Sequence, residues 1–246
     1  MTSLGHATLA DLKEMQSVII AKIANARSFE DAAQIYTSLI YERFRNSIAL
    51  VRHFITVPFH ALPGENQRFV SALAALKASN SPLAPQTLVL SLVGTSGMEA
   101  AWNDRRHSKG HVGIPLISSA FIEAIPMMSR LLKELGVGLD WIDSHDTQIA
   151  EKTMGLMNGL FFVADASREV DAKGRKIIAA QDFVAKYGVQ SVFGFGGGYL
   201  GTKAISVTII FLRERLEKRQ AEFFASTMTR LRTQTVELVK TRIFNM

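Results

Sequence analysis

The chain has 246 residues, 48% of them hydrophobic and 20% charged, a balance typical of globular proteins that argues against disorder. It contains no cysteine, which excludes disulfides, thiolate metal sites, iron–sulfur clusters and cysteine nucleophiles and is compatible with a reducing compartment. Of the net charge of +6, residues 213–242 carry +4, from eight Lys or Arg and four Glu. Because both signs are interleaved there, we interpret this segment as a solvated helix face and expect no nucleic-acid partner.

The sequence predicts neither a secretory signal nor a membrane span. The polar N-terminus leads into a charged stretch at 11–14 and lacks the basic start and apolar core of a signal peptide. The most apolar stretch, 191–212, contains Lys203 and several glycines, which favours two buried strands joined by a turn over a spanning helix. We therefore expect a cytoplasmic protein that begins near Met1 and has no membrane partner.

Two helices are expected in the first forty-five residues. Apolar residues recur at spacings of three and four over residues 9–23, which indicates an amphipathic helix. Ser28 is followed by acidic residues, a pattern typical of an N-cap and first helical turn. A second helix is therefore predicted from Ser28 to about Phe44.

The centre of the chain alternates strand and helix signals. Residues 47–57 are rich in β-branched side chains and end at a proline, which predicts a strand. A helix at 65–77 and a strand at 87–93 follow. Residues 94–114 show no period and gather polar, charged and aromatic side chains. We interpret them as a long ordered loop, and such loops tend to be functional.

The second half of the chain is expected to end in a hairpin and one long helix. Pro126 predicts a kink or a late start in a helix at 119–135. A glycine-rich turn at 196–202 indicates that the last two strands form an antiparallel hairpin, and the final helix has the apolar rhythm of a coiled coil or bundle. The expected elements are strand 139–142, helix 143–158, strand 160–163, polar turn 165–175, helix 181–186, strands 189–195 and 203–211, and helix 213–242.

Together these elements predict an α+β fold in which helices flank an antiparallel sheet. The helices at both termini carry an apolar stripe that needs a cover, either from each other or from a second copy of the chain. We expect the N- and C-terminal helices to form a bundle and the protein to be a homodimer.

Six segments and the order of the elements carry a resemblance to a known family. The segments are residues 49–52, 92–97, 101–106, 108–111, 114–116 and 187–197. In these segments, and in the order helix, strand, helix, strand, long loop, helix, strand, hairpin and exit helix, the chain resembles the GAF-like sensor domains of bacterial sensor histidine kinases and nucleotide cyclases. The resemblance covers roughly residues 28–215.

The resemblance implies a domain organisation and a class of function. It implies an N-terminal amphipathic helix at 1–27, a GAF-like sensory domain at 28–212, and a C-terminal signalling and dimerisation helix at 213–246. Such domains bind a small ligand in signal transduction, for example in two-component systems, and act on a kinase or cyclase. No catalytic sequence of that kind follows here, so the chain is either a stand-alone regulator or an excised piece. No ligand pattern of the family matches, so the ligand and any cofactor are unknown.

The long loop holds the densest group of candidate binding residues, at 102–111. Arginine, lysine and histidine side chains beside an indole are suited to clamping a carboxylate or phosphate while the ring stacks on the ligand. The alternative is that Asp104 pairs with an arginine and pins the loop against the sheet. The candidate ligand-binding residues are Arg52, Trp102, Asn103, Asp104, Arg105, Arg106 and His111.

Metal, haem and catalytic sites find little support in the sequence. His107 and His111 stand four residues apart, which suits a metal only on a helix, and Gly110 between them disfavours one. A histidine that binds haem is an alternative without an attachment motif. The sequence contains no nucleophile elbow and no phosphate loop, so we expect no enzyme.

The leading hypothesis is a dimeric sensor that relays the state of a small ligand through its C-terminal helix. A protein–protein adaptor with a vestigial pocket and a haem-binding sensor are the alternatives.

Overall fold

The fold is organised around one antiparallel sheet of six strands. The computed structural model describes residues 3–76, 83–108, 110–136, 139, 142–143 and 158–245. Within these residues the strands follow the order β3-β2-β1-β6-β5-β4, and every neighbouring pair is antiparallel. The strands are β1 (Ile48–Pro58), β2 (Leu88–Gly97), β3 (Gly113–Pro115), β4 (Asn158–Val163), β5 (Ser191–Gly198) and β6 (Ile205–Leu212).

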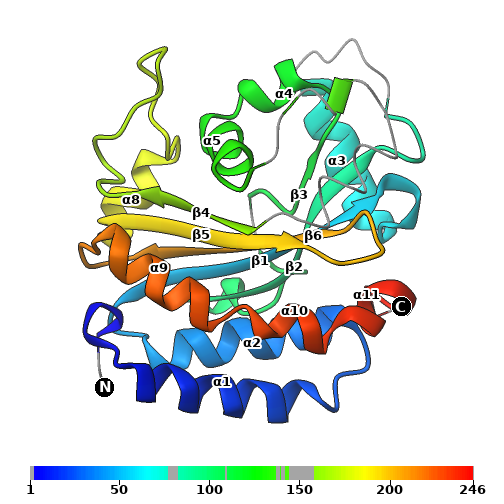
Figure 1. The fold of residues 1–246 in the computed structure, drawn as a ribbon. Coiled ribbons are helices and arrows are strands. Elements are labelled where there is room, and N and C mark those ends of the chain that lie inside the picture. The colour runs from blue at the N-terminus through cyan, green and yellow to red at the C-terminus, as the bar shows by residue number, and fades with distance from the viewer. Residues whose placement is uncertain are drawn as a thin grey trace.

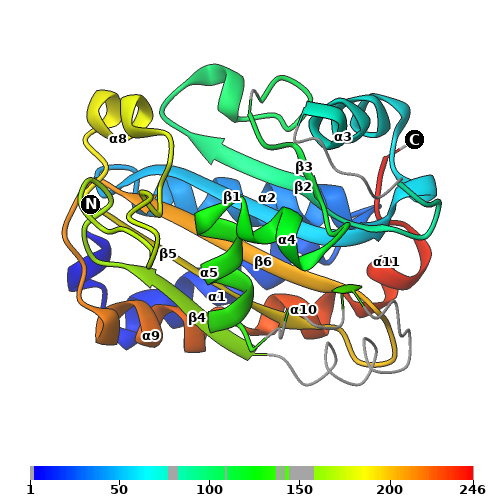
Figure 2. The same ribbon diagram turned by 90° about the horizontal axis from the view of Figure 1, so that it is seen from above.

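Helices cover both faces of the sheet (Figure 1). One face carries the helices of the two termini: α1 (Leu9–Ile23), α2 (Phe29–Arg43), α9 (Lys218–Thr227), α10 (Arg230–Gln234) and α11 (Val236–Thr241). Helices α4 (Ser119–Glu123) and α5 (Pro126–Glu134) lie over the other face, with α3 (Gly64–Leu76) and α8 (Gln181–Tyr187) toward its two sides (Figure 2). Three short 3-10 helices complete the described elements: η1 (Leu4–His6), η2 (Phe59–Ala61) and η3 (Ala100–Trp102).

The N-terminal helices begin where the sequence supplies caps. At the start of α1, Thr8 and Asp11 form a capping box in which each side chain accepts a hydrogen bond from the backbone of the other. At the start of α2, the Ser28 hydroxyl accepts from the N–H of Asp31, so free amide groups of the first turn are satisfied. The predicted helix at 9–23 matches α1, and the predicted N-cap Ser28 is confirmed.

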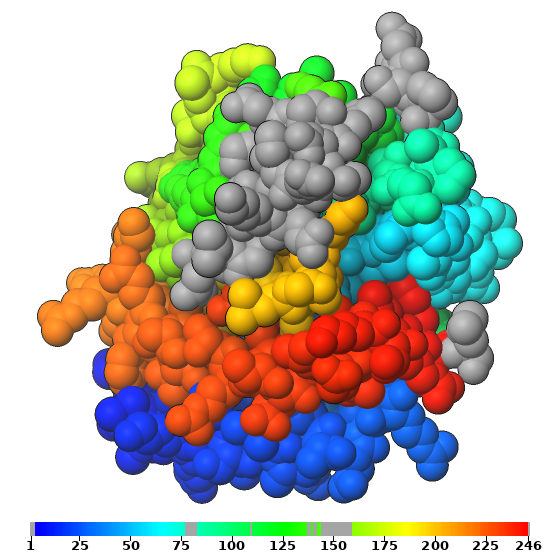
Figure 3. All heavy atoms as spheres, turned by 45° about the vertical axis from the view of Figure 1, so that its right-hand side comes forward, coloured from blue at the N-terminus to red at the C-terminus, as the bar shows by residue number. Residues whose placement is uncertain are grey.

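The terminal helices form a bundle with each other within one chain. Figure 3 shows the C-terminal segment, in orange to red, lying directly against the N-terminal segment, in blue, and α1 contacts both α9 and α10. Leu12 and Ile19 of α1 pack in one buried cluster with Phe224 of α9 and Leu231 of α10. The apolar stripes therefore cover each other, and burial of these large side chains is worth about 2 kcal/mol each. The predicted α+β class and helical bundle are confirmed, and the arrangement is consistent with a GAF-like fold.

The central elements also follow the predictions. Strand β1, helix α3 and strand β4 lie within two residues of the expected bounds, and β5 and β6 pair as an antiparallel hairpin. Pro126 does not kink a single helix, because α4 ends before it and α5 begins with it. Proline is accepted at a first helical position, where its missing N–H has no helical partner to lose.

The predicted long loop and glycine turn are both shorter than expected. Strand β2 continues to Gly97, so the first four residues of the predicted loop 94–114 belong to the sheet, and its last two begin β3. Gly196 to Gly198 are the end of β5 and not a turn. A strand is recognised in a sequence by the alternation of apolar and polar residues, and glycine-rich or fully buried strands lack that alternation. The ends of β2 and β5 were therefore predicted as loop and turn.

The single C-terminal helix predicted at 213–242 is wrong. Residue Arg213 still donates its N–H to the carbonyl of Ser47 beside the sheet, and three helices follow at α9, α10 and α11. Between α9 and α10 the hydroxyls of Thr227 and Thr229 donate to backbone carbonyls of the preceding turn. Such bonds compete with the helical hydrogen-bond ladder and favour an interruption.

Parts of two predictions fall outside the described residues. The strand expected at 139–142 is described only at its first and last positions, where Leu139 lies in a turn and Ile142 is helical. The helix expected at 143–158 is described only at its two ends. Among the helices of the described part, none is long and apolar enough to cross a membrane.

Close approach of helix α2 to the sheet requires Gly94. A Cβ added at Gly94 would lie 2.4 Å from the carbonyl oxygen of Ala33 in α2, so a side chain there would force the helix off the sheet. We expect Gly94→Ala to lower the free energy of unfolding by about 2 kcal/mol. Gly64→Ala is the matched control, because its nearest neighbour is the flexible Arg68 side chain at 3.7 Å. Equal urea midpoints for the two variants would contradict this account.

Candidate functional site

A cavity of about 270 Å³ lies between the sheet and helix α5. It is open to solvent on one side, and its walls come from β1, β2, β3, β6, α5, α8 and the segment that precedes α8. Almost all of its lining is apolar, as in pockets that bind small molecules. The apolar and aromatic lining includes Leu50, Phe54, Leu90, Trp102, Ile114, Ile125, Met127, Met128, Ile177, Ile178, Phe183, Ile209 and Phe211.

Arg52 brings a positive charge to this apolar wall. It lies on β1 between Leu50 and Phe54, which face the same cavity because alternate residues of a strand share a face. Its Nη2 donates to the hydroxyl of Ser108 at 2.8 Å, and Nη1 lies 3.5 Å from the carbonyl oxygen of His111. Burial lowers the pKa of Arg52 to about 10, because removal from water disfavours the charged form. The guanidinium is still protonated at neutral pH.

Aromatic rings form one end of the cavity. The ring centroids of Trp102 and Phe183 are 5.7 Å apart, and those of Phe183 and Phe211 are 5.3 Å apart in an edge-to-face arrangement. Tyr187 packs edge-on against Trp102 at 4.6 Å and donates its hydroxyl to Glu99 at 2.7 Å. That hydrogen bond lowers the pKa of Glu99. The rings are thus fixed by packing with one another and present a rigid apolar surface.

The structure divides the predicted site residues into two groups. Arg52, Trp102 and His111 line the cavity, with His111 exposed at its mouth. The other four are not part of its lining: Asn103, Asp104, Arg105 and Arg106. Asn103 and Asp104 form hydrogen bonds within or next to the loop. The side-chain oxygen of Asn103 accepts from the N–H of Gly97, and Asp104 accepts from the N–H of Arg106.

Arg105 and Arg106 converge on a buried carboxylate, Glu30 of helix α2. The Nε of Arg105 lies 2.8 Å from Oε1 of Glu30, and its Nη2 donates to Oε2 at 3.0 Å. Nη2 of Arg106 lies 2.8 Å from Oε1. The side chains of Glu30 and Arg105 are only 5% and 8% exposed. The pairing that pins this loop therefore runs to α2, whereas the sequence suggested Asp104, which contacts Arg106 at 3.7 Å.

The sequence did not predict most of the residues that line the cavity. The walls from α5 and from Ile177 to Ala180 lie far from Arg52 along the chain, and no spacing rule connects them. The adjacent apolar pair Ile177 and Ile178, which follows a polar turn, was the one local signal available. No group of three or more histidine, cysteine, aspartate or glutamate side chains suited to a metal ion is found within the described ranges.

A buried histidine on the other face of β1 was also missed. His53 is next to Arg52, so it points to the side of the terminal helices, and its ring packs between Phe29 and Tyr36 of α2. Its Nδ1 lies 2.9 Å from the hydroxyl oxygen of Thr208. Burial lowers the pKa of His53 to about 3, so the ring is neutral in the folded protein.

Loss of the Glu30 carboxylate is expected to destabilise the protein strongly. Glu30→Gln leaves the buried Arg105 without its countercharge, and we expect the free energy of unfolding to fall by about 3 kcal/mol in urea titrations. Glu237→Gln is the control, because this carboxylate is 79% exposed and pairs with Lys240 at the surface, where ion pairs contribute little. A Glu30→Gln variant as stable as the control would show that the buried pair is dispensable.

The buried His53 predicts a dependence of stability on pH. Its pKa of about 3 in the folded state is below that of an unfolded histidine, about 6.5, so the unfolded state binds the proton first. Stability from this group is complete above about pH 6.5 and falls by up to about 1.4 kcal/mol per pH unit as the pH decreases toward 3. Unfolding free energies between pH 7 and 5 measure this slope.

His53→Phe keeps the ring contacts and is expected to flatten that slope. His107→Gln is the control, because this side chain is 75% exposed, and it is expected to retain the slope of the parent protein. Titration of the His53 ring by NMR provides a direct check, and a midpoint near 6.5 in the folded protein would refute the prediction.

Comparison with known proteins gives matches among solved structures alone. No protein-family model matches it, and no curated protein matches it. Among solved structures it is similar to one described as the far-red absorbing dark state of JSC1_58120g3 with bound biliverdin IXa. The two are 9% identical, and the match covers 92% of this chain and 99% of that chain with a TM-score of 0.43. A likeness at this level supports no conclusion about the ligand or activity of this chain.

Proposed function

We propose that this protein is a sensory domain that binds a small amphipathic organic anion in the cavity between the sheet and α5. The observation that carries the proposal is the arginine Arg52 in a wall whose described residues are otherwise almost wholly apolar. A ligand with an apolar body and one acidic group complements both features. The proposal is of a regulatory binding domain without a catalytic step.

Desolvation of Arg52 favours an anionic group on the ligand. Burial disfavours the charge of Arg52, as the lowered pKa of about 10 records. A carboxylate, sulfonate or phosphate placed beside the guanidinium regains that lost solvation through charge-assisted hydrogen bonds. Because the surrounding wall is apolar, this interaction is stronger there than in water.

The aromatic end of the cavity supports a ligand that contains a flat apolar group. Trp102, Phe183 and Phe211 offer ring faces and edges held in place by their mutual packing. Rigid rings lose little conformational freedom when a ligand binds, so they favour affinity.

Strand β6 connects the cavity with the cluster of the terminal helices. Strand β6 presents Ile209 and Phe211 to the cavity, and Ile210 between them packs in the cluster of the terminal helices. A change in the cavity can therefore reach the C-terminal helices through one strand. Homodimerisation and action on a kinase or cyclase stay predictions.

The test uses a fluorescent probe of the proposed chemistry. The anion 1-anilinonaphthalene-8-sulfonate combines aromatic rings with a sulfonate, and N-phenyl-1-naphthylamine is a neutral relative. We expect Arg52→Met to weaken binding of the anion by about tenfold or more, because the charge pair is lost, and to leave binding of the neutral probe nearly unchanged. Fluorescence titration measures both affinities.

Two controls make the result specific. Arg168→Met removes an arginine whose side chain is 84% exposed and is expected to leave both affinities unchanged. Thermal unfolding of each variant confirms that the fold is retained. The proposal fails if Arg52→Met affects the two probes equally or not at all. Native mass spectrometry of the purified protein provides a second measurement, because an empty cavity with a bound protein partner would favour the adaptor, and a bound haem the haem sensor.

A further inference from the structure

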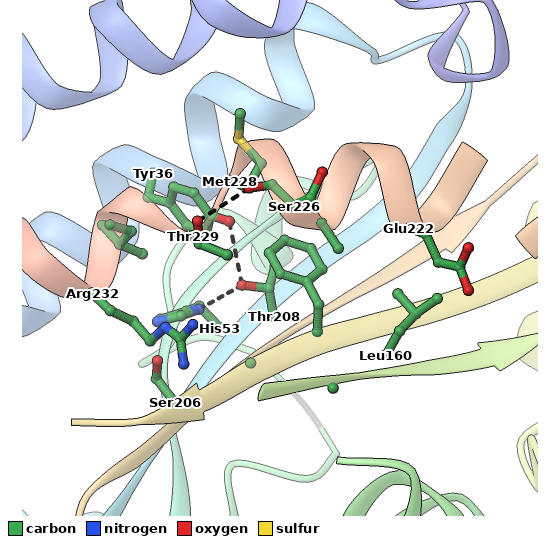
Figure 4. A pocket seen from close by; sticks show the side chains of 15 residues that line it. Tyr36, His53, Leu160, Ser206, Thr208, Glu222, Ser226, Met228, Thr229 and Arg232 are labelled. Atoms are coloured by element: carbon green, nitrogen blue, oxygen red, sulfur yellow. Dashed lines mark hydrogen bonds between the residues drawn. The ribbon is translucent and has the colours of Figure 1, made fainter. Parts of the chain in front are cut away.

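A second cavity lies on the opposite face of the sheet, beneath the C-terminal helices (Figure 4). It has a volume of about 230 Å³ and an open mouth. The sheet separates it from the first cavity, since Arg52 lines one and its neighbour His53 lines the other. Its lining residues are Tyr36, His53, Gly159, Leu160, Phe195, Gly196, Ser206, Thr208, Glu222, Ala225, Ser226, Met228, Thr229, Leu231 and Arg232.

The inner end of this cavity is polar and buried. His53, Ser206 and Thr208 are each 2% exposed, and Tyr36 is 1% exposed. Figure 4 shows a chain of hydrogen bonds from the His53 ring to Thr208 and on to the hydroxyl of Tyr36. Such groups are costly to bury unless each finds a partner.

One atom of this polar group has no partner. Nε2 of His53 is buried and, among the described residues, makes no hydrogen bond, although its residue lines an open cavity. An unsatisfied buried nitrogen costs about 1–3 kcal/mol. A ligand that supplied the missing hydrogen bond would recover that free energy.

The direction of the hydrogen bonds in this chain determines whether Nε2 of His53 is a donor or an acceptor. The Thr208 hydroxyl donates to the oxygen of Tyr36 at 3.4 Å. With that direction its own oxygen accepts from Nδ1–H of His53 at 2.9 Å, and in this tautomer Nε2 carries the lone pair of the neutral ring. In this tautomer Nε2 calls for a ligand with an N–H or O–H donor.

Arg232 sets the charge of the site. It lines the same cavity from α10, and Figure 4 shows its side chain directed toward the His53 end. Desolvation by burial lowers its pKa, and the nearby Tyr36 and Tyr199 hydroxyls oppose that shift. A guanidinium in such surroundings favours an anionic group on the ligand. Among the described residues of the lining the carboxylate is that of Glu222, and it points away from the His53 end in Figure 4.

The remaining wall suits a short apolar group. Leu160, Phe195, Met228 and Leu231 contribute apolar side chains to the lining. A ligand that satisfies all three parts of the cavity has an acidic group, a neighbouring hydrogen-bond donor and a compact apolar substituent.

We propose that this second cavity is a binding site for a small organic acid that carries a hydroxyl or amino donor beside its acidic group. The acid group binds Arg232, and the donor binds Nε2 of His53. The site goes beyond the proposed sensing of an amphipathic anion, because it uses other residues on the other face of the sheet. Hydroxy acids and amino acids share the required chemistry, and the test separates them.

The test uses two probes and two truncated analogues. Mandelate carries a hydroxyl beside its carboxylate, and phenylalanine carries an ammonium group there. Phenylacetate lacks the donor, and 1-phenyl-1,2-ethanediol lacks the acid. We expect at least one of the two probes to bind at least about tenfold more tightly than both analogues in calorimetric or ligand-observed NMR titrations.

Two variants locate the binding. Arg232→Met is expected to weaken binding of the favoured probe by about tenfold or more, whereas Arg230→Met, an exposed arginine of the same helix outside the lining, is expected to change it less than about twofold. The titrations are repeated in an Arg52→Met background, where the first cavity, which also suits an aromatic acid, no longer holds the probe through Arg52. Binding that persists there and depends on Arg232 belongs to the second cavity. Protein labelled with ¹⁵N-histidine reports directly on His53, whose Nε2 resonance is expected to shift when the donor binds.

The inference is overturned by any of three results. The first is that neither mandelate nor phenylalanine binds and the His53 resonance does not move. The second is that the analogues bind as tightly as the probes. The third is that binding is lost in Arg52→Met and unaffected in Arg232→Met, which would place the probe in the first cavity.

Discussion

The buried carboxylate of Glu30 holds together parts of the chain that are distant in sequence. It pairs with Arg105 and Arg106 of the loop after β2, and it accepts a hydrogen bond from the backbone N–H of Asn245 near the C-terminus. Arg105 extends the network to Asn66 of α3 and lies over the ring of Phe244. Because a buried charge without its partner is very unfavourable, the loop and the C-terminal end of the chain are fixed relative to α2 by one side chain.

The contacts of Glu30 also fix the position of loop residues that line the first cavity. The loop segment that supplies Trp102 and His111 to the cavity is held from outside by Glu30, and it bonds to Arg52 through Ser108. Strand β1 then separates two environments through the alternation of its side chains. Arg52 faces an almost wholly apolar cavity with its charge retained, while His53 lies at the polar inner end of the second cavity as a neutral ring.

Local patterns predicted the parts of the fold that depend on local physics. Helix α1, the Ser28 cap and the hairpin of β5 and β6 follow from spacing, capping and turn chemistry. Arg52 and Trp102 were also found, because a charge in a strand and an indole in a polar loop stand out locally. The role of Glu30 was not predictable, since its partner is 75 residues away. The same holds for His53, whose sequence context is that of any buried strand.

The interrupted C-terminal segment changes how a signal can pass through it. A single long helix acts as a rod and carries a displacement at one end to the other. Here the segment bends between α9 and α10, and its two ends are tied down by the bonds of Arg213 to Ser47 and Asn245 to Glu30. Met228 and Thr229 lie at the interruption between α9 and α10, and both residues line the second cavity. A ligand bound there would therefore contact the segment at the point where its helix is interrupted.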